Sequence, residues 1–536
     1  MNLPAALAAF KQAVSDAYVE TDIDILEQYE AGTYKHEGKV LAIVKPANTA
    51  EVQRCMAIAN EFHIPIYPVS GGCNWGYGSK APVKDACVII DLSRMDRITH
   101  YNEAFGYVTI EPGVTLGGLN RFLRSQKSNL VLSTTGGSVD SSLIGNTMER
   151  GIGTGLYAER LGYVCGFEVV LPDGRVIKTG FERYGEDRLT AKTFKWGVGP
   201  YLDGIFTQSN LGIVTSLTMW LTTVPEYFHF IHYEVDSADK YYSLIDRLHE
   251  MAVSGLVRPT LTMYNNFRVL STVRQFPAKH SAEWAHLPSN ERTQKILQYA
   301  NEGMNVKLWT GEICIRGVNK EHAAVQSNAV KDKIASYTDS LSVYEVGKEE
   351  MLQRLNGNGS ADSDSLQDAL KNYLIGKYLG IPDNVPVSQS YWRKDFQVPA
   401  NMNPDKDKCG MIWMCPTVPF DGANVKKAID MIEAIIIKYG FEPAISMQCT
   451  SERSVHLIAS IAWDREVPGE DEKAEQCYDE LHIALHSQGY YFYRETTHAM
   501  ASKIVDQDNT LDDFLKSLKR AVDPNNILAP GRYIKG

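Results

Sequence analysis

The side chains of this chain with the most evident chemistry lie between residues 66 and 80, which read IYPVSGGCNWGYGSK. A β-like run at 64–69 leads into this stretch, and four glycines follow between Gly71 and Gly78. Because glycine has no Cβ, its backbone can approach a ligand closely and adopt positive φ. Successive free N–H groups in such a loop form an anion site that suits a diphosphate. A glycine-rich hairpin turn is the alternative interpretation.

The composition is that of an ordinary globular protein. The 536 residues are enough for two or more cores, and 44% hydrophobic with 22% charged residues are typical values. A net charge of -11 argues against a nucleic-acid binder, which needs a basic face. The sequence has no run of 18 or more apolar residues, so it predicts no membrane span.

The cysteines and the N-terminus both favour a cytoplasmic protein. The 9 cysteines are scattered without a CxxC pair, as expected for reduced thiols, and they offer no zinc site. Residues 1–20 form an amphipathic helical pattern without the basic segment and long apolar core of a signal peptide. The histidines at 482, 486 and 498 share no pattern with carboxylates, so we expect no metal site.

The first part of the chain predicts a mixed α+β domain. No GxGxxG follows its first strand, which excludes a simple Rossmann repeat. The expected strands and helices are strands at 40–45, 64–69, 87–92, 107–111, 166–171, 175–179 and 211–222, and helices at 49–62, 114–127 and 145–152.

The pattern changes at about residue 226. A strand at 227–235 and a helix at 237–254 precede a long region that we expect to be irregular, with a surface loop at 356–364. A compact β-α-β-β-α unit should follow, at 411–418, 425–439, 446–449, 455–463 and 470–488, and then a tail helix at 511–521.

Several segments, in order along nearly the whole chain, together resemble one family. They are SGGCNWGYG at 70–78, VTIEPGV at 108–114, GNTMERGIG at 145–153, VVLPDG at 169–174, GPYLDG at 199–204, SNLGIVT at 209–215, YWRK at 391–394, FYR at 492–494 and VDPNNILAPG at 522–531. This set resembles the FAD-linked oxidases of the vanillyl-alcohol oxidase and p-cresol methylhydroxylase type.

The resemblance implies an α+β protein with a bipartite FAD-binding domain. Residues 1–225 plus 487–536 would form that domain, and residues 226–486 would form a substrate or cap domain over the flavin ring. It also implies a set of cofactor-binding residues: Ser70, Gly71, Gly72, Cys73, Asn74, Trp75, Ser138, Gly145, Asn146, Glu149, Gly153, Ile213 and Arg532. For the glycines a plain turn is the alternative, and for Asn146 a helix cap.

The resemblance also implies a phenol site made of Tyr77, Tyr493 and Arg494. In such enzymes two tyrosines and an arginine bind a phenolate, and hydride leaves the benzylic carbon for flavin N5, giving a p-quinone methide. The residue types suit this task, because a guanidinium and two O–H donors stabilise an oxyanion. Packing of Tyr77 within its loop and a surface position for Tyr493 are the alternatives.

The sequence departs from the family pattern at three places. Met411 stands where some relatives attach FAD covalently, so we expect non-covalent FAD, with a Cys73 thioether as the alternative anchor. The aspartate of vanillyl-alcohol oxidase near N5 falls at Gly136–Gly137, and Asp140 is the nearest carboxylate that could replace it. Thr154 replaces an active-site tyrosine, which predicts a differently shaped pocket.

Trp413 and Cys415 share one face of a predicted strand and are expected to form a pocket wall, although a core position is equally compatible with Trp413. His456 lies in an apolar strand, where a satisfied core histidine is the favoured interpretation.

The sequence therefore predicts an FAD-dependent oxidase or dehydrogenase that acts on a small aromatic substrate, a para-substituted phenol. O2 or an acceptor protein would take the electrons, and a homo-oligomer is compatible with the family. Two alternatives stay open: the same fold acting on a hydroxy acid, sugar or biosynthetic intermediate, or a non-catalytic flavin-fold binding protein. Nothing in charge or pattern supports a nucleic-acid or membrane role.

Overall fold

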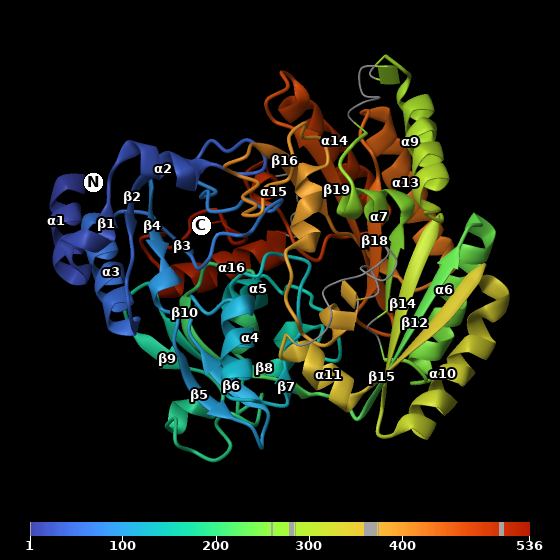
Figure 1. The fold of residues 1–536 in the computed structure, drawn as a ribbon. Helices are drawn as coiled ribbons and strands as arrows, with labels where there is room; N and C mark the ends of the chain where they lie inside the picture. Colours follow the sequence, from blue (N-terminus) through green and yellow to red (C-terminus); the bar gives the residue numbers. More distant parts are fainter. Residues whose placement is uncertain are drawn as a thin grey trace.

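The computed structural model describes residues 2–258, 261–277, 283–284, 286–357, 372–373, 375–502 and 509–535. Most of the surface loop predicted at 356–364 lies outside these residues. Figure 1 shows two smaller sheets from the N-terminal part of the chain on one side and one large sheet on the other. The mixed α+β class predicted from the sequence is confirmed.

The first sheet has the strand order β1-β2-β4-β3, in which β2, β4 and β3 are parallel and β1 is antiparallel. Its strands are β1 (Val19–Glu20), β2 (Val40–Val44), β3 (Ile66–Val69) and β4 (Cys87–Asp91). Helix α3 (Thr49–Phe62) connects β2 to the parallel β3 and packs against α1 (Leu3–Val14). The glycine-rich loop leaves the carboxyl end of β3, so this sheet positions it.

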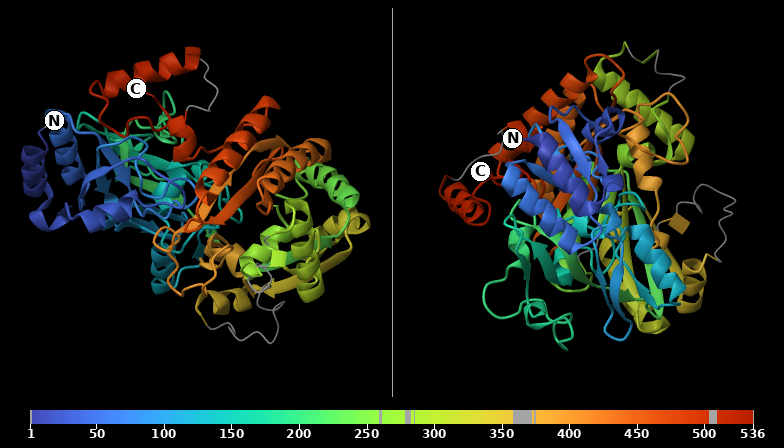
Figure 2. Two further views of the ribbon diagram at one scale, coloured as in Figure 1. Left: turned by 90° about the horizontal axis from the view of Figure 1, so that it is seen from above. Right: turned by 90° about the vertical axis from the view of Figure 1, so that its left-hand side faces the viewer.

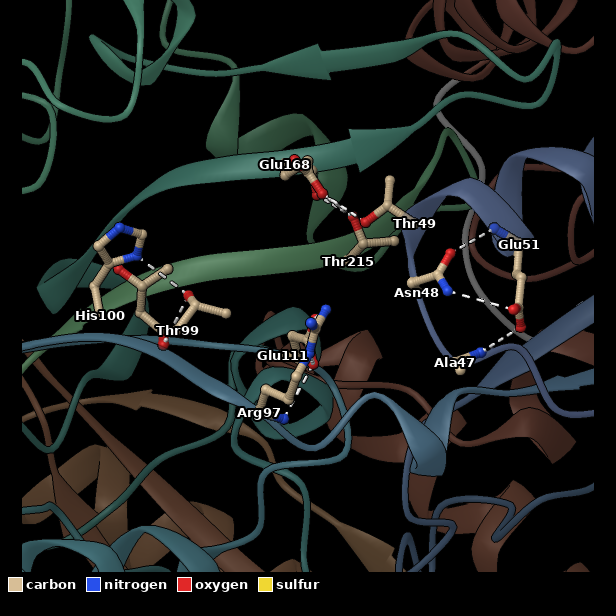
Figure 3. Close-up of polar contacts among 11 residues, drawn as sticks. Ala47, Asn48, Thr49, Glu51, Arg97, Thr99, His100, Glu111, Glu168 and Thr215 are labelled. Carbon is tan, nitrogen blue, oxygen red and sulfur yellow. Dashed lines mark hydrogen bonds and ion pairs between the residues drawn. The ribbon is translucent and has the colours of Figure 1, made fainter.

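The start of α3 is fixed by local hydrogen bonds, which Figure 3 shows. The Asn48 side chain accepts from the N–H of Glu51 at 3.0 Å, and the Glu51 carboxylate accepts from the N–H of Ala47 at 2.8 Å. The Thr49 hydroxyl donates to Glu168 at 2.6 Å, and Thr215 donates to the same carboxylate oxygen at 2.9 Å. Helix α3 is thereby joined to two strands of the second sheet.

The second sheet is antiparallel, with the order β5-β6-β10-β8-β9. Its strands are β5 (Ile98–Asn102), β6 (Tyr107–Ile110), β8 (Val164–Val170), β9 (Val176–Lys178) and β10 (Ile213–Trp220). Helices α4 (Leu116–Ser125) and α5 (Leu143–Met148) pack on it through an apolar cluster around Leu119, Leu143 and Phe167. A short pair, β7 (Leu130–Val131) with β11 (Thr222–Thr223), leads to the rest of the chain.

The third sheet is the large antiparallel one, with the order β15-β12-β14-β13-β18-β19-β16 and with β17 paired to β19. Its strands are β12 (Tyr227–Val235), β13 (Thr262–Asn265), β14 (Trp309–Gly317), β15 (Ser340–Gly347), β16 (Cys409–Met414), β17 (Thr417–Pro419), β18 (Ala444–Cys449) and β19 (Ser454–Asp464). Helices α6 (Ala238–Val253), α10 (Lys320–Ile334), α13 (Gly422–Lys438) and α14 (Glu470–Ser487) share its main apolar core.

The expectation of a long irregular region after residue 254 is wrong. It contains β13, β14 and β15 of the large sheet together with α7 (Asn266–Val273), α9 (Ser289–Met304), α10 and α11 (Lys348–Leu355). Strand β14 reads WTGEICIRG, without clean alternation, and it forms through pairing with β12 and β13, which are distant in sequence. Non-local pairing of this kind overrides weak local propensity.

The C-terminal tail returns to the first sheet. Ile66 donates its N–H to Ile527 at 2.8 Å, and Ala529 donates to Ile66 at 2.7 Å. Helix α16 (Asn509–Val522) precedes this segment, and both views of Figure 2 place the N- and C-termini close together. The tail thus joins the N-terminal sheets, although the domain boundaries at 225, 226 and 487 remain predictions. Among the described helices, none is long and apolar enough to cross a membrane.

Candidate active site

A cavity of about 750 Å³ is lined by residues from the N-terminal sheets, the third sheet and the tail. The glycine-rich loop, the segment 135–154 and the segment 206–214 supply one part of its wall. Strands β13, β16 and β18, helix α7 and the 3₁₀ segment Val385–Tyr391 supply another. The cavity is therefore formed by parts of the chain that lie far apart in the sequence.

The glycine-rich loop presents its backbone to this cavity. Within the described part of the chain, the amide N–H groups of residues 71 to 74 donate no hydrogen bond to protein. Gly72 has φ of +74°, a conformation that side-chain-bearing residues rarely adopt. Four consecutive unpaired N–H groups at a cavity wall are suited to the oxygens of a diphosphate.

A second backbone segment lies directly against this loop. A Cβ at Gly71 would come within 3.2 Å of the Asp140 carbonyl, and one at Gly145 would come within 2.6 Å of the Ser70 hydroxyl. The two glycines therefore allow an approach that larger residues would prevent.

Several buried polar atoms of the cavity wall have no protein partner among the described residues. They include Asn146 Oδ1, Ser209 Oγ and Asn210 Oδ1. Buried polar groups in native proteins are nearly always hydrogen-bonded, so a ligand with matching polar atoms is expected here. Together with the free amides, these atoms fit a large polar cofactor.

Glu149 is the anionic centre of the site. Its carboxylate lies 3.2 Å from Arg494 Nε, forms an ion pair with Arg532 and accepts from the Tyr533 hydroxyl at 2.8 Å. Burial by itself would raise the pKa of Glu149, but Arg532 and then Arg494 lower it below its usual value. Glu149 therefore stays ionised and neutralises much of the charge of the two arginines.

Tyr77, Tyr493 and Arg494 converge beside Glu149. The Arg494 guanidinium lies 4.0 Å from the ring centroid of Tyr77, and Arg494 also donates to Asn74. Tyr493 is held by backbone pairing, since its N–H donates to the carbonyl of Cys415 at 3.2 Å. Burial raises the pKa of both phenols, so each keeps its proton and remains a donor.

The cavity continues past Trp413 on β16. The Trp413 indole donates to the carbonyl of Trp75 at 3.1 Å, and the Arg268 guanidinium lies 4.9 Å from its ring centroid. Lys377 donates to the Tyr264 hydroxyl at 2.6 Å and lies 3.3 Å from Glu312. This part of the cavity therefore combines aromatic walls with two cationic side chains.

Comparison with known proteins agrees with this geometry. Residues 40–180 match the FAD binding domain family. The chain is 35% identical over 540 residues to the 1'-carboxy-chondrochloren decarboxylase of Chondromyces crocatus, covering 99% of this chain and 97% of that protein. It is 27% identical over 530 residues to the 4-cresol dehydrogenase (hydroxylating) flavoprotein subunit of Pseudomonas putida, covering 98% and 94% of the two chains.

A crystal structure of p-cresol methylhydroxylase with substrate bound is similar over 99% of this chain and 96% of that one, with a TM-score of 0.86 and 27% identity. The chain belongs to the p-cresol methylhydroxylase-type family of FAD-linked oxidases. This family member is an FAD-dependent oxidoreductase. FAD, when bound, would supply the redox chemistry, and the protein would place the substrate against it.

Most residues predicted for the cofactor and the substrate line the cavity. They are Ser70, Gly71, Gly72, Cys73, Asn74, Trp75, Tyr77, Gly145, Asn146, Glu149, Gly153, Thr154, Ile213, Trp413, Tyr493, Arg494 and Arg532. Their individual roles remain proposals. Given the free amides at 71–74 and the orphaned atoms at 146, 209 and 210, these residues fit FAD.

Three predicted residues lie away from the cavity surface. Ser138 is buried and accepts from the N–H of Asp140 at 3.1 Å. Asp140 itself is exposed and does not line the cavity, so the geometry gives no support to its predicted catalytic role. Cys415 is fully buried behind the wall, and its thiol lies 2.9 Å from the Tyr77 hydroxyl.

Other cavity residues were missed by the sequence analysis. Gln208 donates to the carbonyl of Tyr493 at 2.8 Å and so helps to hold that residue in place. Arg268, Gln389 and Lys377 come from the region expected to be irregular, where no pattern indicated them.

His482 and His486 do meet a carboxylate, Glu495, with ligand atoms within 4.8 Å of one another, contrary to the expectation that they share no pattern with one.

The attachment of FAD provides the first test. Met411 lines the cavity but cannot form a link, and burial raises the pKa of Cys73 to about 12, which keeps its thiol protonated and unreactive. We expect acid precipitation of the holoprotein to leave all flavin absorbance in the supernatant, for the parent and for Cys73→Ser alike. A yellow pellet from the parent would contradict non-covalent binding, and its loss in Cys73→Ser would locate the bond.

Asp405 holds the far side of the glycine-rich loop and provides a pH test. It accepts from Ser79 at 2.7 Å and from the Trp75 indole at 3.1 Å, and burial raises its pKa to about 7. In the unfolded chain the pKa of Asp405 is about 4, so the folded state binds the proton more tightly than the unfolded state does. The stability that this proton contributes is complete below about pH 4 and is lost as the pH rises through about 7.

Asp405→Asn should therefore be more stable than the parent at pH 8, by about 1 kcal/mol or more, with little difference at pH 4. Urea unfolding at several pH values measures this difference, with the exposed Asp395→Asn as control. A difference that does not change with pH would show that burial of the charge is not its cause.

Proposed function

We propose that this protein oxidises para-substituted phenols at the benzylic carbon, with FAD as the hydride acceptor. The observation that carries the proposal is the convergence of Tyr77, Tyr493 and Arg494 on one cavity that also fits FAD. Full-length similarity to the 4-cresol dehydrogenase flavoprotein subunit supports it.

The three side chains suit the binding of a phenolate. Arg494 keeps its charge, since its pKa is raised although burial opposes this, with Glu149 as the main cause. The two tyrosines remain O–H donors at neutral pH. Two donors and a cation lower the pKa of a bound phenol, and the electrons of the oxyanion then help to expel hydride from the para benzylic carbon. The substrate becomes a p-quinone methide.

The electrons must leave the flavin to an acceptor in a second half-reaction. The 4-cresol dehydrogenase relative is a flavoprotein subunit, which supports an acceptor protein, and O2 is the other acceptor that the family resemblance implies. Failure of every phenol to reduce the flavin would favour the alternative of a hydroxy acid, sugar or biosynthetic intermediate. Cytoplasmic location and homo-oligomerisation remain predictions.

A second candidate reaction is oxidative decarboxylation, which the name of the Chondromyces crocatus relative suggests. A specific observation favours it: the cavity offers no evident free carboxylate base within its described wall. Glu149 and Glu312 are ion-paired, and Glu234 accepts from Ser340 at 2.6 Å. Loss of a proton or addition of water to a quinone methide profits from a base, whereas loss of CO2 needs none.

The balance of this second reaction is simple. In 3-(4-hydroxyphenyl)propanoate the carboxylate is on the carbon next to the benzylic carbon. After hydride has left the benzylic carbon, the C–CO2 bond breaks and its electron pair forms the new C=C bond. The ring regains its aromatic phenolate, and the products are 4-vinylphenol and CO2.

The phenol site is tested with Tyr493→Phe and Arg494→Lys. Each should lower the rate of anaerobic flavin reduction by 4-ethylphenol by about 100-fold or more, because each removes a group that stabilises the developing oxyanion. Stopped-flow absorbance measures the rate, and the FAD content of each variant is checked first. Tyr491→Phe changes an exposed tyrosine two residues earlier and should behave as the parent. Unchanged rates in both site variants would refute this site.

Products of 3-(4-hydroxyphenyl)propanoate distinguish the two reactions. Decarboxylation gives 4-vinylphenol and CO2, in amounts equal to the flavin reduced in a single anaerobic turnover. Loss of a proton instead gives 4-coumarate, and addition of water gives the 3-hydroxy acid. Chromatography of the quenched reaction separates all three, and either acid as the main product would exclude the decarboxylation.

A further inference from the structure

Arg268 is a cation in the cavity wall whose role the phenol site does not explain. It lies on the first turn of α7, where the Asn265 side chain caps the helix by accepting from the N–H of Arg268 at 2.9 Å. Its guanidinium donates to the side-chain oxygen of Gln389 and lies 4.9 Å from the Trp413 ring centroid. The N-terminal cap of α7, the Trp413 ring on β16 and the buried amide of Gln389 therefore fix its position.

The other cations of the cavity wall all have carboxylate partners. Arg494 and Arg532 share Glu149, and Lys377 lies 3.3 Å from Glu312. For Arg268, within the described part of the chain, no carboxylate oxygen lies within 4.0 Å of the guanidinium. Among the described residues, its charge therefore has no ion-pair partner.

The groups next to Arg268 do not balance its charge either. Burial lowers the pKa of Arg268 to about 10, and the neighbouring groups that oppose this are Tyr264, Cys415, Tyr373 and Tyr77. Those groups are phenols and a thiol, which are neutral at pH 7. A desolvated cation among neutral groups is costly unless an anion joins it.

Arg268 and Arg494 face the same compartment of the cavity. Both residues line the same cavity, and the Cys415 thiol behind its wall lies 2.9 Å from the Tyr77 hydroxyl. Arg494 lies over the Tyr77 ring, and Arg268 lies over the Trp413 ring. A phenol held at Arg494 therefore shares its chamber with a second, unpaired cation.

We infer that Arg268 binds a carboxylate of the substrate and selects acidic para-substituted phenols over neutral ones. This inference rests on the proposed phenol oxidation only for the statement that the substrate carries a phenol ring. The carboxylate site itself does not depend on that proposal. Guanidinium groups bind carboxylates through two parallel hydrogen bonds, which gives both affinity and orientation. Arg268 would form this ion pair when the substrate binds, so its role is the same whether or not CO2 later leaves.

The first experiment measures binding without any oxidation. 3-Phenylpropanoate has the carboxylate but no phenol, and its methyl ester has the same skeleton with one added methyl group and no charge. Titration of the FAD-loaded protein by calorimetry should show the acid binding about 10- to 100-fold more tightly than the ester. Arg268→Gln should remove this preference, and Arg274→Gln, an exposed arginine just beyond the same helix, should keep it.

The outcomes separate this inference from the proposed function. If the parent shows no preference for the acid, or if Arg268→Gln retains the preference, the carboxylate site is refuted. If the acid preference depends on Arg268 but neither 4-ethylphenol nor 3-(4-hydroxyphenyl)propanoate reduces the flavin, the carboxylate site stands and the phenol oxidation fails.

A stability measurement guards against a merely structural role for Arg268. Arg268→Met replaces an unbalanced charge with an apolar side chain of similar length. If Arg268 serves a ligand, this variant should melt at the same temperature as the ligand-free parent or higher, because the uncompensated charge is gone. It should also lose the stabilisation that 3-phenylpropanoate gives the parent. A variant that melts lower and keeps the ligand response would overturn the inference.

Discussion

The buried carboxylate of Glu149 is the interaction on which the rest of the site depends. It is contributed by the N-terminal part of the chain, and its partners Arg494, Arg532 and Tyr533 come from the C-terminal part. An ionised carboxylate cannot stay in this place unless those groups are docked, because an isolated buried charge costs several kcal/mol. Pairing of the tail with the first sheet therefore brings Arg532 and Tyr533 to Glu149, and Glu149 in turn holds Arg494 beside Tyr77.

The arrangement of charge around the cavity explains how one chamber could serve two purposes. Glu149 balances the arginines near the predicted cofactor segments, and Glu312 balances Lys377. The Arg494 charge is shared with Glu149, which lies 3.2 Å from Arg494 Nε. Arg268 has no such partner among the described residues, which leaves it available to an anionic substrate. The difference between paired and unpaired cations thus carries the proposed selectivity.

Local patterns were sufficient for many elements. Helix α3 follows its predicted bounds because Asn48 caps it, Glu51 accepts from the N–H of Ala47 just before the cap, and an apolar stripe continues to Phe62. Strand β12 also matches its prediction, since its aromatic and β-branched residues favour extended structure. Strands β13 to β15 were missed because their order in the sheet differs from their order in the chain. Their formation depends on partners that no local window contains.

The order of the motifs was enough to predict the family and the use of FAD, and the glycines after β3 predicted a loop with free amides, because glycine permits close approach and positive φ. It also indicated Tyr77, Tyr493 and Arg494 through their motifs. Which charged side chains lie next to one another followed only from the folded structure. It paired Glu149 with two arginines, left Asp140 at the surface, and brought Arg268 beside Trp413. Ion pairs form between side chains a few ångströms apart in space. A single sequence does not show which residues more than a hundred positions apart lie that close together.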